Sequence, residues 1–352
     1  MNDQFRIDSH KLMYHPHRVV QLLDGKDDWG KAKSIYPIYV EISPVGGCNH
    51  KCLMCGVDYV IMGNLEKGII PQLNADVYAE RFEEMGALGI KSFMFAGAGE
   101  PLLHRRINDL VSAAHTAGID TSFTTNGVLL DRLNLSGVSW VKVSINGGNK
   151  ESYARVHQTK ESDFDRVVAN VRDAVKRKGG CTIGIQLVLL PENKDSVDDF
   201  RALGEEIGAD YVVVKPFSQH KFSINRQYEN FDPRAIKIAD SGKLVVRKEA
   251  MEAVTAPIPY TKCQSTPFLW AYLEADGDLY GCSAYLLDDR FNYGNLNTHT
   301  FKEVWQGEKR KANWDYVRNH LDIHECRQSC RMNEDNIYMN DLIHGVPHQN
   351  FI

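Results

Sequence analysis

The chain has 352 residues, of which 43% are hydrophobic and 25% are charged, and its formal net charge at pH 7 is −5. A chain of this length and composition buries a large core, which excludes disorder as its main state. The slight acidic excess argues against a nucleic-acid backbone as the principal partner. No stretch has the roughly 18 apolar residues of a membrane span, and the first ten residues lack the apolar core of a signal peptide. We therefore expect a globular, cytoplasmic protein with no membrane or nucleic-acid partner.

Strand-like and helical segments alternate along the chain up to residue 217. Runs rich in β-branched and aromatic residues predict strands over residues 36–42, 91–96, 120–124, 140–145, 182–190 and 211–215. Apolar residues at helical spacing predict helices over residues 18–23, 74–88, 163–177 and 195–207. This alternation is typical of right-handed βαβ units around a parallel sheet. Six strands are about two short of a closed barrel, so we expect an α/β fold, a partial (β/α)6 barrel, with a flat doubly wound sheet as the alternative.

The sequence divides into five parts. We expect a polar leader, a partial barrel, a connection with a short helix, a cysteine-bearing α+β module and a tail, over residues 1–35, 36–225, 226–260, 261–335 and 336–352 respectively. In either α/β fold, ligands bind at the carboxyl ends of the strands. Functional residues are therefore expected in the segments that directly follow the predicted strands.

Three of the eight cysteines, Cys48, Cys52 and Cys55, lie close together directly after the first predicted strand. In a reducing compartment, clustered cysteines indicate metal or redox chemistry rather than disulfides. Three thiolates suit an iron–sulfur cluster better than a structural zinc ion, which takes four ligands. A 4Fe–4S cluster with only three protein ligands keeps one iron open. A zinc loop that borrows a distant fourth ligand is the alternative.

This CxxxCxxC loop after a first strand resembles that of the radical SAM superfamily, whose members share a partial β/α barrel. The resemblance implies a 4Fe–4S cluster on the three cysteines, with an open iron that binds S-adenosylmethionine (SAM). It implies that the reduced cluster cleaves SAM to a 5′-deoxyadenosyl radical, which abstracts hydrogen from the substrate. It further implies an electron donor of the flavodoxin or ferredoxin type.

Segments after later strands resemble SAM-binding motifs of the same family. Residues 98–101 resemble its GGEP segment, which implies SAM contacts by Gly99 and Glu100, the latter through the methionine amino group. Ala98 stands where glycine is usual, and backbone binding tolerates this change if the φ of Ala98 is negative. Asn126, in the Thr-Asn-Gly that ends the third strand, faces the ligand in this interpretation, and a plain turn is the alternative.

The fourth strand ends in a segment that resembles the family's SxDG motif, which implies SAM contacts by Ser144 and Asn146. Asn146 replaces the usual aspartate, so hydrogen-bonding capacity is kept and the charge is lost. Arg155 matches an arginine that pairs with the SAM carboxylate, and Met54 lies where the family has an apolar residue against adenine. A solvated arginine on a helix and a core methionine are the corresponding alternatives.

A second cysteine group consists of Cys263, Cys282, Cys326 and Cys330. Four thiolates are the full ligand set of one more 4Fe–4S cluster, and a tetrahedral zinc is the alternative. The Asp-Gly hairpin before Cys282 resembles the start of the SPASM motif of radical SAM enzymes. Because the intermediate cysteines of a full SPASM domain are missing, the module also resembles the shorter twitch domain. The resemblance therefore implies two 4Fe–4S clusters, one that binds SAM and one auxiliary.

Two functional classes fit these motifs: an enzyme that starts radical chemistry, and an electron carrier that needs no SAM pocket. The enzyme is favoured because Glu100, Ser144 and Arg155 lie at or just beyond strand ends. The sixth strand leads into further polar side chains, which we interpret as catalytic candidates: Lys215, Gln219 and His220. Donors and acceptors at this rim suit a small polar substrate such as a sugar, cyclitol or nucleotide.

Four protein thiolates leave the auxiliary cluster without an open iron, so we expect it to accept an electron rather than to bind substrate. The predicted reaction is the two-electron oxidation of a carbinol, which makes the enzyme an oxidoreductase of the dehydrogenase type. An epimerase, dehydratase or cyclase of a similar substrate and a peptide-modifying maturase are the alternatives. Cys181, outside both groups, precedes the fifth strand and is expected to be a buried apolar residue rather than a hydrogen-atom donor.

Overall fold

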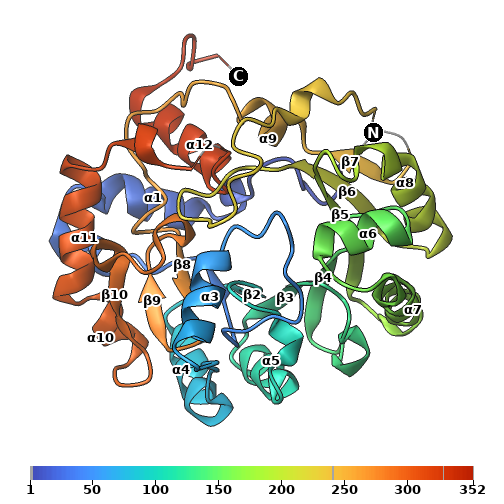
Figure 1. Ribbon diagram of the computed structural model, residues 1–352. Coiled ribbons are helices and arrows are strands. Elements are labelled where there is room, and N and C mark those ends of the chain that lie inside the picture. The colour runs from blue at the N-terminus through green and yellow to red at the C-terminus, as the bar shows by residue number, and fades with distance from the viewer. Residues whose placement is uncertain (1–2, 240–241, 328, 352) are drawn as a thin grey trace.

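The computed structural model describes residues 3–239, 242–327 and 329–351. The outermost residues of the predicted leader and tail, two residues of the predicted connection and one residue of the predicted cysteine-bearing module lie outside these ranges. Within them, ten strands form one sheet in the order β10-β9-β8-β1-β2-β3-β4-β5-β6-β7. Figure 1 shows this sheet as a crescent, with α4, α5, α7 and α8 along its outer side and α9 and α12 across its open side.

Seven parallel strands form the barrel part of the sheet. They are β1 (Tyr39–Ile42), β2 (Ser92–Phe95), β3 (Asp120–Thr125), β4 (Val138–Ser144), β5 (Thr182–Leu189), β6 (Tyr211–Pro216) and β7 (Leu244–Val246). The strands follow one another in sequence order without reversal, as in a barrel, whereas a doubly wound sheet reverses its order near the middle. The predicted partial α/β barrel is therefore confirmed, and β7 is an additional short strand that lies in the predicted connection.

The barrel strands are joined by helices, of which α4, α5, α7 and α8 lie on the outer side (Figure 1). The helices of this part are α3 (Asp58–Glu66), α4 (Ala75–Ala87), α5 (Ile107–Thr116), α6 (Lys150–His157), α7 (Glu161–Arg177) and α8 (Val197–Glu206). The predicted helices over residues 74–88, 163–177 and 195–207 correspond to α4, α7 and α8. The side chain of Asn74 caps α4 by accepting a hydrogen bond from the N–H of Asp76. Helices α3, α5 and α6 were not predicted, and α3 and α6 border the cysteine loop.

Alternation along the strands separates an apolar outer face from a polar inner face. Val141 and Val143 of β4 are fully buried in the core between sheet and helices. Their neighbours Lys142 and Ser144 therefore point into the barrel, because successive side chains of a strand lie on opposite faces. By the same alternation Lys215 of β6 faces inward, since Val214 lies in the outer core.

The cysteine-bearing module extends the barrel sheet. Its strands are β8 (Trp270–Leu273), β9 (Asp278–Tyr280) and β10 (Asn292–Asn295), and its helices are α10 (Phe301–Trp305), α11 (Glu308–Asn319) and α12 (Asn333–His344). Strand β8 pairs in parallel with β1, and β9 pairs with β8 as an antiparallel hairpin. The hairpin that leads to Cys282 is thus built on the strand next to the one that leads to Cys48. Helix α12 runs across the boundary expected at residue 335.

The leader contributes α1 (Pro16–Gly25) and α2 (Trp29–Ala32), and α9 (Lys248–Glu252) is the short helix of the connection. Short 3-10 helices are η1 (Leu12–Tyr14), η2 (Pro101–Leu103), η3 (Leu130–Arg132), η4 (Lys194–Ser196), η5 (Pro233–Ala235), η6 (Ser283–Tyr285), η7 (Asp289–Phe291) and η8 (Ile323–Glu325). Buried Arg310 of α11 ties the leader to the module, because it donates hydrogen bonds to the carbonyls of Ala32 and Pro267. No helix in the described ranges is long and apolar enough to cross a membrane.

Candidate functional site

The first cysteine group lies in the loop between β1 and α3, which crosses the centre of the crescent in Figure 1. Cys48, Cys52 and Cys55 are free and partly buried. Burial raises the pKa of Cys48 to about 12, with a further contribution from the Glu100 carboxylate, and raises the pKa of Cys55 to about 11. The pKa of Cys52 is also raised, by burial and by the other two thiolates. The raised pKa values mean that the three thiols do not ionise readily by themselves. A bound metal centre would supply the positive charge that stabilises their thiolates, so the group matches a metal site.

The loop is held in place by segments that are distant in sequence. Leu53 receives support from two sides: its N–H donates to the carbonyl of Val156 in α6 at 2.9 Å, and its carbonyl accepts from Asn225 Nδ2 at 2.8 Å. The hydroxyl of Ser223 donates to the carbonyl of Cys55 at 3.2 Å. The segment after β6 therefore fixes the geometry of the cysteine loop.

Two histidines that were not predicted lie beside Cys52. His157 Nδ1 lies 3.1 Å from Cys52 Sγ and 3.2 Å from His50 Nδ1. His157 Nε2 lies 2.9 Å from the carbonyl oxygen of Ile145, so this nitrogen must carry the proton. Burial, followed by the charge of His50, lowers the pKa of His157 to about 3, which keeps the ring neutral. The ligand atoms of His50, Cys52 and His157 lie within 4.8 Å of one another, so the two rings restrict the orientation of the Cys52 thiol.

The segment expected to bind the SAM methionine packs directly against the cysteine loop. Gly97 and Gly99 have φ values of 101° and 156°, whereas Ala98 between them is outside the positive-φ region. The condition for replacing glycine by alanine at residue 98 is therefore met. A Cβ on Gly99 would approach the carbonyl oxygen of Val45 to 2.1 Å, so only glycine allows this contact.

Glu100 links the ends of β2 and β3. Its buried carboxylate accepts hydrogen bonds from Leu102 N (3.1 Å), Thr125 Oγ1 (2.5 Å) and Asn126 N (2.7 Å). Asn126 Nδ2 in turn donates to Asn49 Oδ1 in the cysteine loop at 2.7 Å. The structure thus brings Glu100 and Asn126 to the loop, and their contacts with SAM stay predictions.

The remaining predicted SAM contacts differ in their surroundings. Ser144 faces the barrel interior and accepts from Gln186 Nε2 at 3.5 Å. Asn146 is fully buried at a φ of 54°, and its Oδ1 accepts from Val188 N at 2.8 Å, which is a packing role between β4 and β5. Arg155 is half exposed and forms an ion pair with Glu151 one turn earlier in α6. Met54, a residue of the loop itself, packs at the edge of a small core that includes Phe217. Neither Asn146 nor Arg155 is directed by these contacts toward a ligand.

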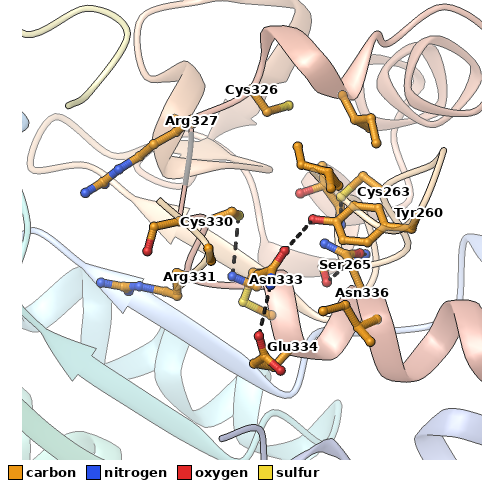
Figure 2. A pocket seen from close by; sticks show the side chains of 18 of the residues that line it. Tyr260, Cys263, Ser265, Cys326, Arg327, Cys330, Arg331, Asn333, Glu334 and Asn336 are labelled. Carbon is orange, nitrogen blue, oxygen red and sulfur yellow. Dashed lines mark hydrogen bonds between the residues drawn. The ribbon is translucent and has the colours of Figure 1, made fainter. Parts of the chain in front are cut away.

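The second cysteine group lines a cavity of about 240 Å³ in the C-terminal module. Figure 2 shows three of its four members, Cys263, Cys326 and Cys330, around this space. The fourth, Cys282, also lines it. Burial raises the pKa of Cys330 to about 12 and that of Cys326 to about 11.

Hydrogen-bond donors face the sulfur atoms of this cavity. The N–H groups of Thr266 and Met332 lie 3.4 Å from Cys263 Sγ and Cys330 Sγ, and the Tyr285 hydroxyl lies 3.4 Å from Cys326 Sγ. Four thiols around one space, with donors aimed at three of them, match the ligand set of a single iron–sulfur cluster.

The residues after β6 connect the two cysteine sites. His220 stacks on Tyr59 of α3 with ring centroids 5.5 Å apart, and its Nε2 lies 3.2 Å from the carbonyl oxygen of Ser283, next to Cys282. Burial, followed by the charge of Arg327, lowers the pKa of His220 to about 4. Gln219 Nε2 donates to the carbonyl of Asn225 at 3.0 Å. Gln219 and His220 are therefore held by the backbone of the site.

Lys215 differs from these two, because its side chain has no hydrogen bond or ion pair to the part of the chain that the structure describes. Its pKa is lowered well below the usual value by burial and by the positive charges of Lys142, Arg327 and Arg247. Sequence reasoning missed Lys142, although its alternation with Ser144 along β4 was visible. It also missed Glu274 after β8, a buried carboxyl whose pKa is raised to about 8 by burial and then by the charge of Asp276.

Comparisons with known proteins agree with this geometry. A probable GTP 3′,8-cyclase of Methanosarcina acetivorans is 25% identical over 205 residues, a match that covers 56% of this chain and only 57% of the cyclase. A PqqA peptide cyclase of Ruegeria pomeroyi is 24% identical over 304 residues, which cover 82% of this chain and 78% of the cyclase. The crystal structure of SuiB from Streptococcus suis superposes with a TM-score of 0.62 at 15% identity, over 96% of this chain and 79% of SuiB.

Family models match both cysteine-bearing parts. Residues 42–203 match the radical SAM superfamily, and residues 263–331 match SPASM, an iron–sulfur cluster-binding domain. The first range contains the cysteine loop and the segments that pack on it, and the second contains all four cysteines of the cavity. The chain therefore belongs to the radical SAM superfamily, with SAM and a 4Fe–4S cluster as cofactors of its barrel and a SPASM iron–sulfur domain at its C-terminal end.

Proposed function

We propose that this protein is a radical SAM dehydrogenase with two 4Fe–4S clusters, which oxidises a carbinol of a small polar substrate such as a sugar, cyclitol or nucleotide. The observation that carries the proposal is the set of four thiols around one cavity in the SPASM domain. Four protein ligands leave no open iron for the substrate, so this domain serves as an electron acceptor. When bound, SAM and the clusters supply the abstraction of a hydrogen atom and the uptake of one electron. We propose a flavodoxin or ferredoxin as the donor that starts the cycle.

We assign Lys215 as the base that accepts the proton of the substrate hydroxyl. Oxidation of a carbinol removes a hydrogen atom from carbon, a proton from oxygen and one electron, and a C=O double bond forms. Lys215 stands at the carboxyl end of β6 on the inner face, and its lowered pKa favours the neutral amine that can accept the hydroxyl proton. Gln219 and His220 shape the same rim and keep the loop after β6 against the cysteine loop.

We expect Lys215→Met to retain SAM cleavage and to lose product. General base catalysis contributes a factor of roughly 10² to 10⁴, so oxidised product per SAM cleaved should fall by about 100-fold or more. Deoxyadenosine and product are measured together by mass spectrometry, with the exposed residue Lys176→Met of α7 as the matched control. Product formation by Lys215→Met at the rate of the control would show that another group takes the proton.

The mass of the product separates dehydrogenation from its alternatives. A panel of sugars, cyclitols, nucleotides and peptides is tested for stimulation of deoxyadenosine formation with reduced flavodoxin as donor. A product that has lost two hydrogens supports the proposal. An isomer indicates an epimerase or cyclase, loss of water indicates a dehydratase, and a modified peptide indicates the type of substrate seen in SuiB, which has been crystallised with its precursor peptide.

Cys181 provides a second test of the same proposal. It is 3% exposed and lies directly before β5, at the amino end of the barrel and opposite the cysteine loop. Burial raises the pKa of its thiol to about 11. We expect Cys181→Ala to keep full turnover, and in D₂O we expect no deuterium at the oxidised carbon. An isomeric product that carries deuterium and disappears in Cys181→Ala would identify an epimerase instead.

A further inference from the structure

Four cationic side chains, here called the inner basic cluster, gather on the inner side of the barrel. They are Lys142, Lys215, Arg247 and Arg327. Lys142 and Lys215 come from β4 and β6 and face inward by strand alternation, as described above. Arg247 directly follows Val246, which lies in the outer core, and its N–H donates to the carbonyl of Val214 in β6 at 2.9 Å. Arg327 comes from the SPASM domain between two cysteines of the cavity. The cluster is thus assembled by three barrel strands and the C-terminal module together.

These charges have few partners in the protein. Within the described ranges, the side chains of Lys142 and Lys215 form no hydrogen bond or ion pair, although both are only partly exposed, and Lys142 Nζ lies 5.7 Å from the centroid of the Trp140 ring. Arg247 Nε lies 3.5 Å from Asp8 Oδ1, which makes Asp8 the one carboxylate paired with a member of the cluster in these ranges. The neighbouring Arg331 is not a member of the cluster, because it forms an ion pair with Glu41 of β1.

Arg327 lines the cysteine cavity, but its guanidinium is held by the segment after β6. Figure 2 shows its side chain pointing away from Cys263 and Tyr260. The guanidinium donates from Nε to Ser218 Oγ at 3.1 Å and from a terminal nitrogen to the carbonyl of Ser218 at 3.3 Å. Ser218 is three residues after Lys215, so Arg327 extends toward the substrate rim and adds its charge there.

The pKa shifts of the two lysines agree with the placement of all four cations on the inner side of the barrel. Burial and the charge of Arg247 lower the pKa of Lys142 to about 8. All of the charges that act on Lys215 are positive and belong to the cluster. Positive charges that are poorly hydrated and mutually repulsive destabilise the site unless an anion joins them. In the described ranges Asp8 pairs with Arg247, and the thiols of Cys330 and Cys282 act on Arg327, so the charges of Lys142 and Lys215 are the ones left available to a ligand.

We propose that the substrate carries an oxyanionic group, a phosphate ester or a carboxylate, which binds between Lys142, Arg247 and Arg327 next to Lys215. The inference rests on the proposed function, because it assigns the substrate class of that same site. Lysine and arginine are the usual partners of such anions, and arginine adds planar hydrogen-bond geometry. A bound anion also stabilises the ammonium group that forms when Lys215 accepts the hydroxyl proton.

Chemical labelling tests the inference without any need to know the substrate. Anaerobically purified, cluster-loaded protein is treated with acetic anhydride at constant ionic strength, and acetylation of individual lysines is followed by mass spectrometry. We expect pyrophosphate or inorganic phosphate to slow acetylation of Lys142 and Lys215 at least fivefold, and not that of exposed Lys309 in α11. Protection by succinate alone would identify a carboxylate ligand. Equal rates with and without every anion would overturn the inference.

Calorimetry with variants supplies the second readout. We expect Lys142→Met to bind pyrophosphate at least about tenfold more weakly than the wild type, Lys142→Arg to restore much of the affinity, and the control Lys309→Met to bind normally. Equal affinity in Lys142→Met and Lys309→Met would contradict the assignment. The result is separable from the proposed reaction: anion binding without oxidised product rejects only the dehydrogenase, and oxidation of an uncharged substrate without anion binding rejects only this site.

Discussion

Replacement of Cys52 by alanine should abolish SAM cleavage and leave the SPASM-domain cluster in place. The two remaining thiols of the loop cannot hold a 4Fe–4S cluster, so roughly half of the iron should be lost if each site holds one cluster. The same result is expected for Cys48→Ala and Cys55→Ala, because each thiol supplies one ligand. Iron and sulfide assays on anaerobically purified protein measure the loss, and deoxyadenosine formation measures the cleavage.

Cys181→Ala is the matched control, since it removes a buried thiol that lies outside both cysteine groups. It should keep all of the iron and the full rate of deoxyadenosine formation. Deoxyadenosine formation by Cys52→Ala would place the radical site elsewhere. Zinc in place of iron in the wild-type protein would support the alternative in which His50 and His157, which lie beside Cys52, complete a metal site.

The features that sequence predicted well are local ones. The loop of Cys48, Cys52 and Cys55 directly follows a short β-branched strand, so the pattern and its position on the fold can be read within a single stretch of chain. The strand and helix periods are also local, which is why β1 to β6 and the helices α4, α7 and α8 were found, although α5, which has the same length as α8, was not. Helix α6 has eight residues, and a segment this short carries little periodic signal.

The features that were missed depend on pairing between distant segments. Strand β8 joins the barrel sheet by pairing with β1 more than 200 residues earlier, and nothing in either strand specifies the partner. His157 reaches Cys52 only because α6 packs beside the loop. The alternation of Lys142 with Ser144, in contrast, is a period-2 signal that sequence alone carries. The alternation predicts only that Lys142 faces inward. It indicates an anion site only once the fold brings Arg247 and Arg327 to the same side of the sheet.

Removal of a cysteine from the SPASM domain should also have a large effect, on product formation rather than on SAM cleavage. Cys282→Ala should leave SAM cleavage intact and lower the yield of oxidised product by about 100-fold or more, because the substrate radical then lacks its electron acceptor. Deoxyadenosine and product are quantified in the same reaction. Product formation at the wild-type ratio would show that this domain is structural. Because Cys282→Ala could also disturb the fold of the hairpin, a second variant keeps all four thiols.

Tyr285→Phe removes only the hydroxyl that lies 3.4 Å from Cys326 Sγ. With the sulfur bound to iron, the hydroxyl is the donor, and a donor to a cluster sulfur stabilises the reduced, more negative state. We therefore expect Tyr285→Phe to lower the reduction potential of the auxiliary cluster and to slow product formation while SAM cleavage continues. A redox titration followed by electron paramagnetic resonance measures the potential. If the cluster instead shows an open iron whose spectrum changes when substrate is added, it binds substrate directly, and the function of the domain is substrate chelation rather than electron acceptance.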